Sequence, residues 1–153
     1  MVGAVLRAAR GAVMPVSEDV KQAMLEFYKR FSAGDVAAFA ERMTDQEDAL
    51  VIGTDPGQWA QGHDAWVAGY AAVMEQMPGV KLRAGDRLTA FEDGSIGWAA
   101  DRAWIVLPDG AEIPFRITAV FRNESATWKI VTAHLSLGVP DAKLTELLPQ
   151  LLG

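Results

Sequence analysis

The stretch AEIPFRITAVFRNESATWKIVTAHLSLGVP, which runs from Ala111 to Pro140, decides the fold of this chain. Apolar and polar side chains alternate along its first half, from Ile113 to Arg122. Such alternation is typical of a strand with one face on an apolar core. The return segment, Trp128 to Leu137, is rich in β-branched and aromatic residues, as strands are. We therefore predict two long paired strands, joined by the polar turn Asn123-Glu124-Ser125.

The segments on either side of this pair carry the signals of further helices and strands. Ser17 begins a helix with apolar residues at three- and four-residue steps, and Gly34 and Asp35 end it and start the next. Asp-Gly pairs mark two hairpin turns between the later strands. The elements predicted in this way are a first helix from Ser17, a helix over 36–43, a short strand over 49–53, a helix from Gly62-His63-Asp64 to Pro78, strands over 81–91 and 95–107, and a last helix over 142–148.

Helices first and long consecutive strands afterwards indicate an α+β fold. We expect a curved, mostly antiparallel sheet wrapped around three N-terminal helices, with an interior pocket between the two layers. The domain is predicted over residues 16–153. Residues 1–15 are predicted to be an N-terminal extension, with translation starting at Met1 or at Met14.

Composition limits the function classes. The 153 residues fit one domain, and a net charge of −6 argues against nucleic acid, whose phosphates require a clustered positive field. The chain has no cysteine, which excludes disulfides and thiol chemistry. The apolar runs before Met14 are too short for a membrane span and lack the pattern of a secretory signal. We therefore expect no membrane partner, and a cytoplasmic protein fits best.

Three motifs resemble the SnoaL-like group of the nuclear transport factor 2-like (ketosteroid isomerase-like) superfamily. They are the helix end Phe27-Tyr28-x3-Ser32-Ala-Gly-Asp35, the helix start Gly62-x-Asp64, and Trp128-Lys-Ile-Val-x-x-His134-x-Ser136 on the final strand. The resemblance covers Val16 to about Pro140. It implies a cone-shaped α+β barrel with a deep pocket, commonly a homodimer packed through the sheet. It does not imply one activity, since the fold hosts isomerases, cyclases, hydrolases, binding modules and kinase association domains.

The ketosteroid isomerase residues do not carry over onto this sequence. The position of the catalytic base falls near Gly53, with Asp55 out of register, and the donor tyrosine position falls on Phe27. Tyr28 lies about 100° further around the helix. The second donor position falls on or near Thr118. The sequence therefore disfavours isomerisation of the steroid type.

Asp101 is the candidate catalytic residue. It shares one face of its strand with Gly97, Ala99, Ala103 and Ile105, and small side chains on that face leave room for a ligand. A lone carboxylate in an apolar cavity suits general acid or base work, because desolvation destabilises its charged form. The alternative is a reversed register, with Asp101 in solvent beside an arginine.

The opposite face of the sheet is predicted to be polar and aromatic, which is the composition of an interface. The residues assigned to it are Trp98, Arg102, Trp104, Arg116, Thr118 and His134, with Trp128 on the same face. We favour a homodimer through this face. The alternative places His134 and Arg116 in the pocket as an anion-binding pair, and a strand bulge would change the assignment.

The pocket is predicted to be lined by Tyr28, Trp59, Trp66, Ala99, Phe115, Ile117, Ala119, Ala133 and Leu135. Trp59 is expected on a loop, where it could act as a mobile gate. The two histidines are far apart in sequence, so no metal site is predicted, and no cofactor motif occurs.

These observations favour a protein that binds a small, largely apolar organic molecule without a cofactor. The main alternative is a cofactor-independent isomerase, cyclase or hydrolase with Asp101 as acid or base. A third alternative is a dimerisation module.

Overall fold

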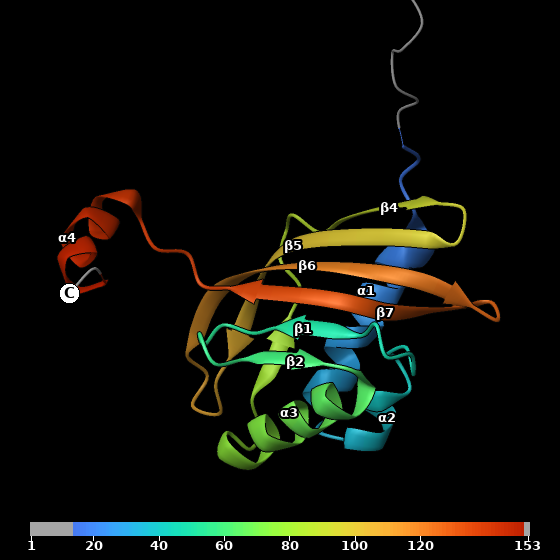
Figure 1. The fold of residues 1–153 in the computed structure, drawn as a ribbon, viewed down its shortest axis with the longest axis horizontal. Helices are drawn as coiled ribbons and strands as arrows, with labels where there is room; N and C mark the ends of the chain where they lie inside the picture. The colour runs from blue at the N-terminus through green and yellow to red at the C-terminus, as the bar shows by residue number, and fades with distance from the viewer. Residues whose placement is uncertain (1–13, 152–153) are drawn as a thin grey trace, which may run out of the picture.

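The computed structural model describes residues 14–151, which form an α+β fold with N-terminal helices and a mixed, mostly antiparallel seven-stranded sheet (Figure 1). The prediction of an α+β fold with N-terminal helices and a mostly antiparallel sheet is thus confirmed. The predicted extension lies outside the described residues except for Met14 and Pro15. The elements in order are α1 Glu18–Ala33, α2 Val36–Ala40, β1 Leu50–Ile52, β2 Trp59–Gln61, α3 His63–Gln76, β3 Lys81–Arg83, β4 Thr89–Asp93, β5 Ile96–Val106, β6 Glu112–Glu124, β7 Thr127–Ser136 and α4 Asp141–Leu151.

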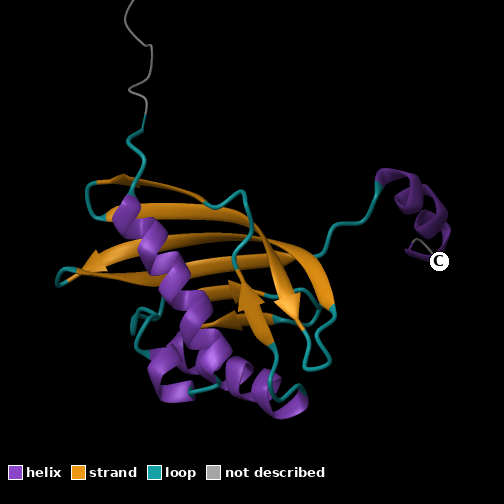
Figure 2. Ribbon diagram, turned by 180° about the vertical axis from the view of Figure 1, so that it is seen from behind, coloured by secondary structure: helices purple, strands orange, loops and turns teal. Residues whose placement is uncertain are grey.

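The sheet is organised around β5, β6 and β7, the two hairpins that the alternating pattern predicts. Its strand order is β2-β1-β7-β6-β5-β3, and β4 also pairs with β5. Every pairing between these strands is antiparallel except that of β1 with β7. Figure 2 shows α1 crossing one face of this curved sheet, with α2 and α3 beyond its far end.

The helix boundaries follow the capping residues. The Ser17 hydroxyl accepts a hydrogen bond from the Val20 amide, and Asp35 accepts one from Ala38 at the start of α2. Gly34 adopts a φ of 71°, the left-handed conformation that ends α1 and that glycine tolerates. These predictions are confirmed, although α2 ends at Ala40 and not at Met43.

The strand predicted over residues 81–91 is wrong, because two strands lie there. β3 pairs with the end of β5 and β4 pairs with its beginning, and the chain crosses between them at Gly85. A Cβ atom at Gly85 would collide with the Arg102 carbonyl oxygen. The close approach of this backbone to β5 therefore requires glycine and interrupts the strand.

The hairpin between β6 and β7 differs from the prediction in two ways. Ser125 and Ala126 have φ values of 51° and 65°, so the turn is the tight pair 125–126 and not 123–125. Val120 pairs with Thr132 while Phe121 pairs with Ile130, which is a β-bulge. The bulge exchanges the two faces along β7. Trp128 therefore packs against the core and not on the outer sheet face, contrary to prediction.

Two further elements differ from their predictions. Trp59 lies in β2, a strand that the sequence analysis assigned to a loop, and it pairs with Ile52. The last helix extends from Asp141 to Leu151 and continues through Pro149. Among residues 14–151, no helix is both long and apolar enough to cross a membrane.

Candidate functional site

A cavity of about 360 Å³ lies between the helices and one end of the sheet. Aromatic and aliphatic side chains from α1, α2, α3, the β1–β2 hairpin and the ends of β5 and β7 line it. They include Phe27, Phe31, Phe39, Val51, Trp59, Trp66, Tyr70, Val73, Met77, Val80, Leu82, Ile105 and Leu135. The lining is therefore almost entirely apolar.

Tyr70 fixes the wall that α3 contributes to the cavity. Its hydroxyl donates a hydrogen bond to the Phe31 carbonyl oxygen at 2.8 Å, and its ring stacks on Phe39 with 3.8 Å between centroids. Burial raises the pKa of Tyr70, because the phenolate would lose its hydration. The hydroxyl is thus neutral and already engaged, so this residue offers a ligand mainly its ring.

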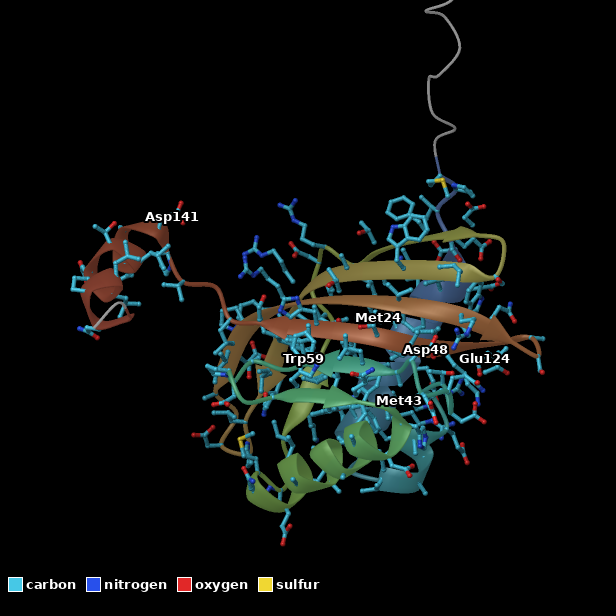
Figure 3. All side chains as sticks on the ribbon, in the orientation of Figure 1. Met24, Met43, Asp48, Trp59, Glu124 and Asp141 are labelled. Carbon is cyan, nitrogen blue, oxygen red and sulfur yellow. The ribbon has the colours of Figure 1, made fainter. Side chains whose placement is uncertain are left out.

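The rim of the cavity is the loop that joins β1 to β2. The Gly53 amide donates to the Gln58 carbonyl oxygen at 2.9 Å, and the Asp55 amide donates to Gln58 Oε1 at 3.1 Å. A side chain at Gly53 would collide with Gln58. The loop is therefore closed by its own hydrogen bonds. It leads into Trp59, which is 64% exposed at the rim (Figure 3).

Asp101 is buried in the core, where it is only 4% exposed. Its Oδ2 atom accepts hydrogen bonds from the Tyr28 hydroxyl at 3.1 Å and from the Gly85 amide at 2.9 Å. Its Oδ1 atom is also buried and has no hydrogen-bond partner among the described residues. Burial, the nearby charge of Asp101 and the hydrogen bond to it all raise the pKa of Tyr28. The tyrosine is therefore a neutral donor to a buried carboxyl group.

The cavity does not collect all the residues predicted to line it. Among them, Trp59, Trp66 and Leu135 line the cavity. The other predicted pocket residues and Asp101 are not part of its lining. The residues that instead fill the core between α1 and the sheet are Tyr28, Ala99, Phe115, Ile117, Ala119 and Ala133. The sequence does not predict that Phe31, Phe39 and Met77 line the cavity. The helical spacing of such residues indicates only burial.

The outer face of the sheet, which is turned away from the helices, carries the predicted interface residues. Arg102 pairs with Arg116 across β5 and β6, Thr118 pairs with His134, and Trp104 pairs with Pro114. Trp98 is partly buried there and stacks on Phe91 with 5.9 Å between centroids. His134 and Arg116 are exposed on this face and are absent from the cavity lining.

Trp104 carries a cation above its ring. The Arg83 guanidinium carbon lies 5.4 Å from the Trp104 ring centroid, and Arg83 forms an ion pair with Glu112 at 2.8 Å. Arg102 and Arg116 form no ion pair with any described residue. The outer face thus presents two unneutralised arginines side by side.

Within the described part of the chain, no three His, Cys, Asp or Glu side chains gather closely enough to hold a metal ion. His63 contacts its neighbour Asp64, with 3.1 Å between Nδ1 and Oδ1.

Solved structures with the same fold come from several bacteria. An NTF2-like protein of unknown function from Pseudomonas putida is 15% identical, with a TM-score of 0.67 over 84% of this chain and 94% of its own. A proposed calcium/calmodulin-dependent protein kinase type II association domain from Thiobacillus denitrificans is 17% identical, with a TM-score of 0.70 over 82% and 99%. A proposed NTF2-like dehydratase from Streptomyces avermitilis is 19% identical, with a TM-score of 0.68 over 80% and 96%.

At these identities the likeness shows the fold alone, and most of the similar structures belong to proteins of unknown function. A comparison with curated proteins finds no match. The model of the SnoaL-like domain matches residues 20–141. These residues include most of α1, the whole sheet and the residues that line the cavity. The chain therefore belongs to the SnoaL-like domain family, within the NTF2-like fold.

Proposed function

We propose that this protein has a cone-shaped fold and binds one small, largely apolar organic molecule in the cavity between the helices and one end of the sheet. The observation that carries the proposal is the cavity of about 360 Å³ with its apolar lining. Its volume is within the range of about 300–1,000 Å³ that is typical of ligand pockets. The few side chains with hydrogen-bonding groups on its wall, among them Thr54 and Gln58, would orient the ligand.

Gly69 provides a direct test, because it lines the cavity from α3 and a Cβ atom there meets no atom of the described residues within 4 Å. Gly69→Phe should fill the cavity with little disturbance of α3. Ala68→Phe is the matched control, since Ala68 is the exposed neighbour on the same helix. The probe is a fluorescent naphthalene, titrated into wild type and both variants.

We expect saturable binding to the wild type and to Ala68→Phe, and none to Gly69→Phe. Equal binding to all three proteins, or none to the wild type, would overturn the proposal. Circular dichroism of each variant establishes that the fold is retained.

A second candidate is a cofactor-independent isomerase, cyclase or hydrolase in which Asp101 transfers a proton. The buried Oδ1 atom without a partner favours it, because such an oxygen is free to accept a hydrogen bond from a substrate. Binding remains the first proposal, since Asp101 is absent from the cavity lining. For any compound that is turned over, Asp101→Asn should abolish turnover and leave affinity unchanged. Unchanged turnover in this variant would exclude the second candidate.

The outer sheet face supports a homodimer as part of the same proposal. Aromatic residues and arginine are enriched in interfaces, and Trp98, Trp104, Arg102 and Arg116 gather on this face. The likeness to a proposed kinase association domain agrees with an assembly role. Sedimentation equilibrium should find a dimer for the wild type and a monomer for Trp98→Asp. A monomeric wild type would contradict the dimer while leaving the ligand proposal intact.

A further inference from the structure

The C-terminal helix α4 is an amphipathic helix that packs on no other helix or strand among residues 14–151. Figures 1 and 2 show it held away from the sheet and from the other helices, at the end of the segment that follows β7. Leu144, Leu147 and Leu148 lie at three- and four-residue steps and are 44%, 36% and 43% exposed. A helix of 11 residues is marginal in water by itself, so an apolar stripe of this kind needs a surface to cover it.

The same stripe includes one acid, Asp141, that forms no ion pair with any residue the structure describes. Asp141 lies three residues before Leu144 and seven before Leu148, so all three share a face of the helix. It is exposed at the start of α4 (Figure 3). Glu146, by contrast, forms an ion pair with Lys143 on the other side of α4. The docking face of α4 therefore consists of a carboxylate followed by leucines.

The outer sheet face offers the complementary order of groups. Arg102 and Arg116 are directly opposite each other, and like charges in this arrangement repel unless an anion lies between them. The next row on the same face is Trp104 with Pro114, two largely apolar side chains, and the Arg83 guanidinium lies above the Trp104 ring. These rows are about 7 Å apart along the strands. With Asp141 over the arginines, Leu144 and Leu148 would lie roughly 4.5 and 10.5 Å along the helix, on either side of the Trp104–Pro114 row.

In a dimer whose two-fold axis lies near the arginine row, the neutralising acid has to come from outside the sheet face. A two-fold axis near the arginine row would bring four guanidinium groups together if the two sheets met there directly. The segment leading to α4 begins at Ser136, which pairs with Arg116 in this same row. In such a dimer each α4 therefore leaves its own chain beside the arginines of the other.

We infer that α4 crosses to a second copy of the chain and packs on its outer sheet face, with Asp141 on Arg102 and Arg116 and the leucines on Trp104 and Pro114. The inference rests on the proposed dimer through the outer sheet face and refines it, because α4 of the partner, and not the partner's sheet, covers the Arg102–Arg116 and Trp104–Pro114 rows. It makes α4 an exchanged arm and not a lid on its own subunit.

The cysteine-free sequence allows a direct test by disulfide trapping. Full-length Leu144→Cys and Pro114→Cys variants that carry different tags are mixed and oxidised. We expect a covalent heterodimer from this pair. None should form when Leu144→Cys is mixed with Gln22→Cys, whose cysteine would be exposed on α1. A chain that carries both Leu144→Cys and Pro114→Cys and closes only within itself would overturn the inference, as would equal trapping in the control.

Charge reversal gives the second measurement. Asp141→Arg should weaken the dimer by roughly tenfold or more in Kd, and Asp141→Arg combined with Arg116→Asp should restore most of the affinity. Glu75→Arg, at an exposed position of α3, is the control and should leave Kd unchanged. A wild-type dimer that is insensitive to Asp141→Arg would contradict the inference and leave the sheet-face dimer standing. A wild-type monomer would contradict both.

Discussion

Tyr28 on α1 donates its hydroxyl hydrogen to Asp101 on β5 over 3.1 Å, in a part of the core where both side chains are buried. This contact joins α1 to the sheet, and it is the one hydrogen bond between two ionisable side chains within the described core. Tyr28→Phe removes the donor and leaves the carboxyl group with only the Gly85 amide. We expect a loss of about 1–3 kcal/mol in the free energy of unfolding, because a buried acceptor loses a partner.

Urea denaturation of the wild type and Tyr28→Phe measures this loss. Phe31→Leu is the packing control, because it changes a side chain on the same helix that has no hydrogen-bonding group. Equal stability of Tyr28→Phe and the wild type would show that the hydrogen bond contributes nothing.

The raised pKa of Tyr28 predicts a loss of stability in alkali. In the unfolded chain this phenol ionises near pH 10, whereas in the folded protein it stays neutral to higher pH. The unfolded state therefore releases a proton first, and the free energy of unfolding falls as pH rises above about 10. Tyr28→Phe should make this fall shallower. Denaturation curves from pH 8 to 11 check it, and identical slopes for the two proteins would contradict it.

Gly85 tests the close approach of the chain to β5. A Cβ atom at this position would collide with the Arg102 carbonyl oxygen and lie 2.9 Å from Asp101 Oδ1. Gly85→Ala should lower the free energy of unfolding by about 1–3 kcal/mol or more, as overpacking does. Gly138→Ala is the matched control, because no atom of residues 14–151 lies within 4 Å of its added Cβ, and it should be nearly neutral. Thermal denaturation distinguishes them, and equal midpoints would argue against the collision.

Arg122 holds the loop after α2 against β6. It forms ion pairs with Asp48 at 2.9 Å and Glu124 at 3.1 Å, and it donates to the hydroxyl of buried Thr44 at 3.1 Å. Figure 3 labels Asp48 and Glu124 at the same end of the fold. The hydrogen bond from Arg122 lowers the pKa of Asp48. Arg122→Gln should therefore lower the free energy of unfolding by about 1 kcal/mol at neutral pH, because a network of charged groups stabilises more than an isolated surface ion pair does.

The contribution of Asp48 to the stability of the folded state depends on pH, and the direction of this dependence follows from its lowered pKa. It is complete above the pKa of the unfolded chain, near 4, and is lost as pH falls and the carboxylate is protonated in the folded state. The stability difference between wild type and Arg122→Gln should shrink in acid. Arg87→Gln, in the exposed loop between β3 and β4, is the control. A difference that stays constant down to pH 2 would exclude this ion pair as its source.

How far the sequence predicts the fold depends on the regularity of each strand. In β5 every second residue is buried from Gly97 to Ala103, so the inward position of Asp101 follows from parity alone. In β7 the bulge opposite Val120 and Phe121 exchanges the faces, and Trp128 was assigned to the wrong one. A bulge leaves no mark in a hydrophobic pattern that is rich in β-branched residues on both faces.

The cavity was predicted less well than the sheet. Parity identifies which side chains point inward, but Phe115 and Ile117 point inward into packed core while Leu135 reaches the cavity. The difference depends on where the helices end. The β1–β2 hairpin, which supplies the rim, consists of strands of three residues, too short to show any period.

Trp59 links this rim to the proposed function. Its side chain is mostly exposed and contributes little to packing, so Trp59→Ala should change the free energy of unfolding by no more than about 0.5 kcal/mol. It also lines the cavity, so the same substitution should weaken binding of the naphthalene probe, since apolar contact area with the ligand is lost. Trp98→Ala, on the outer face, is the control for removing an indole. Because the two sites are on opposite faces of the sheet, a loss of probe affinity in Trp98→Ala and not in Trp59→Ala would place the ligand outside this cavity.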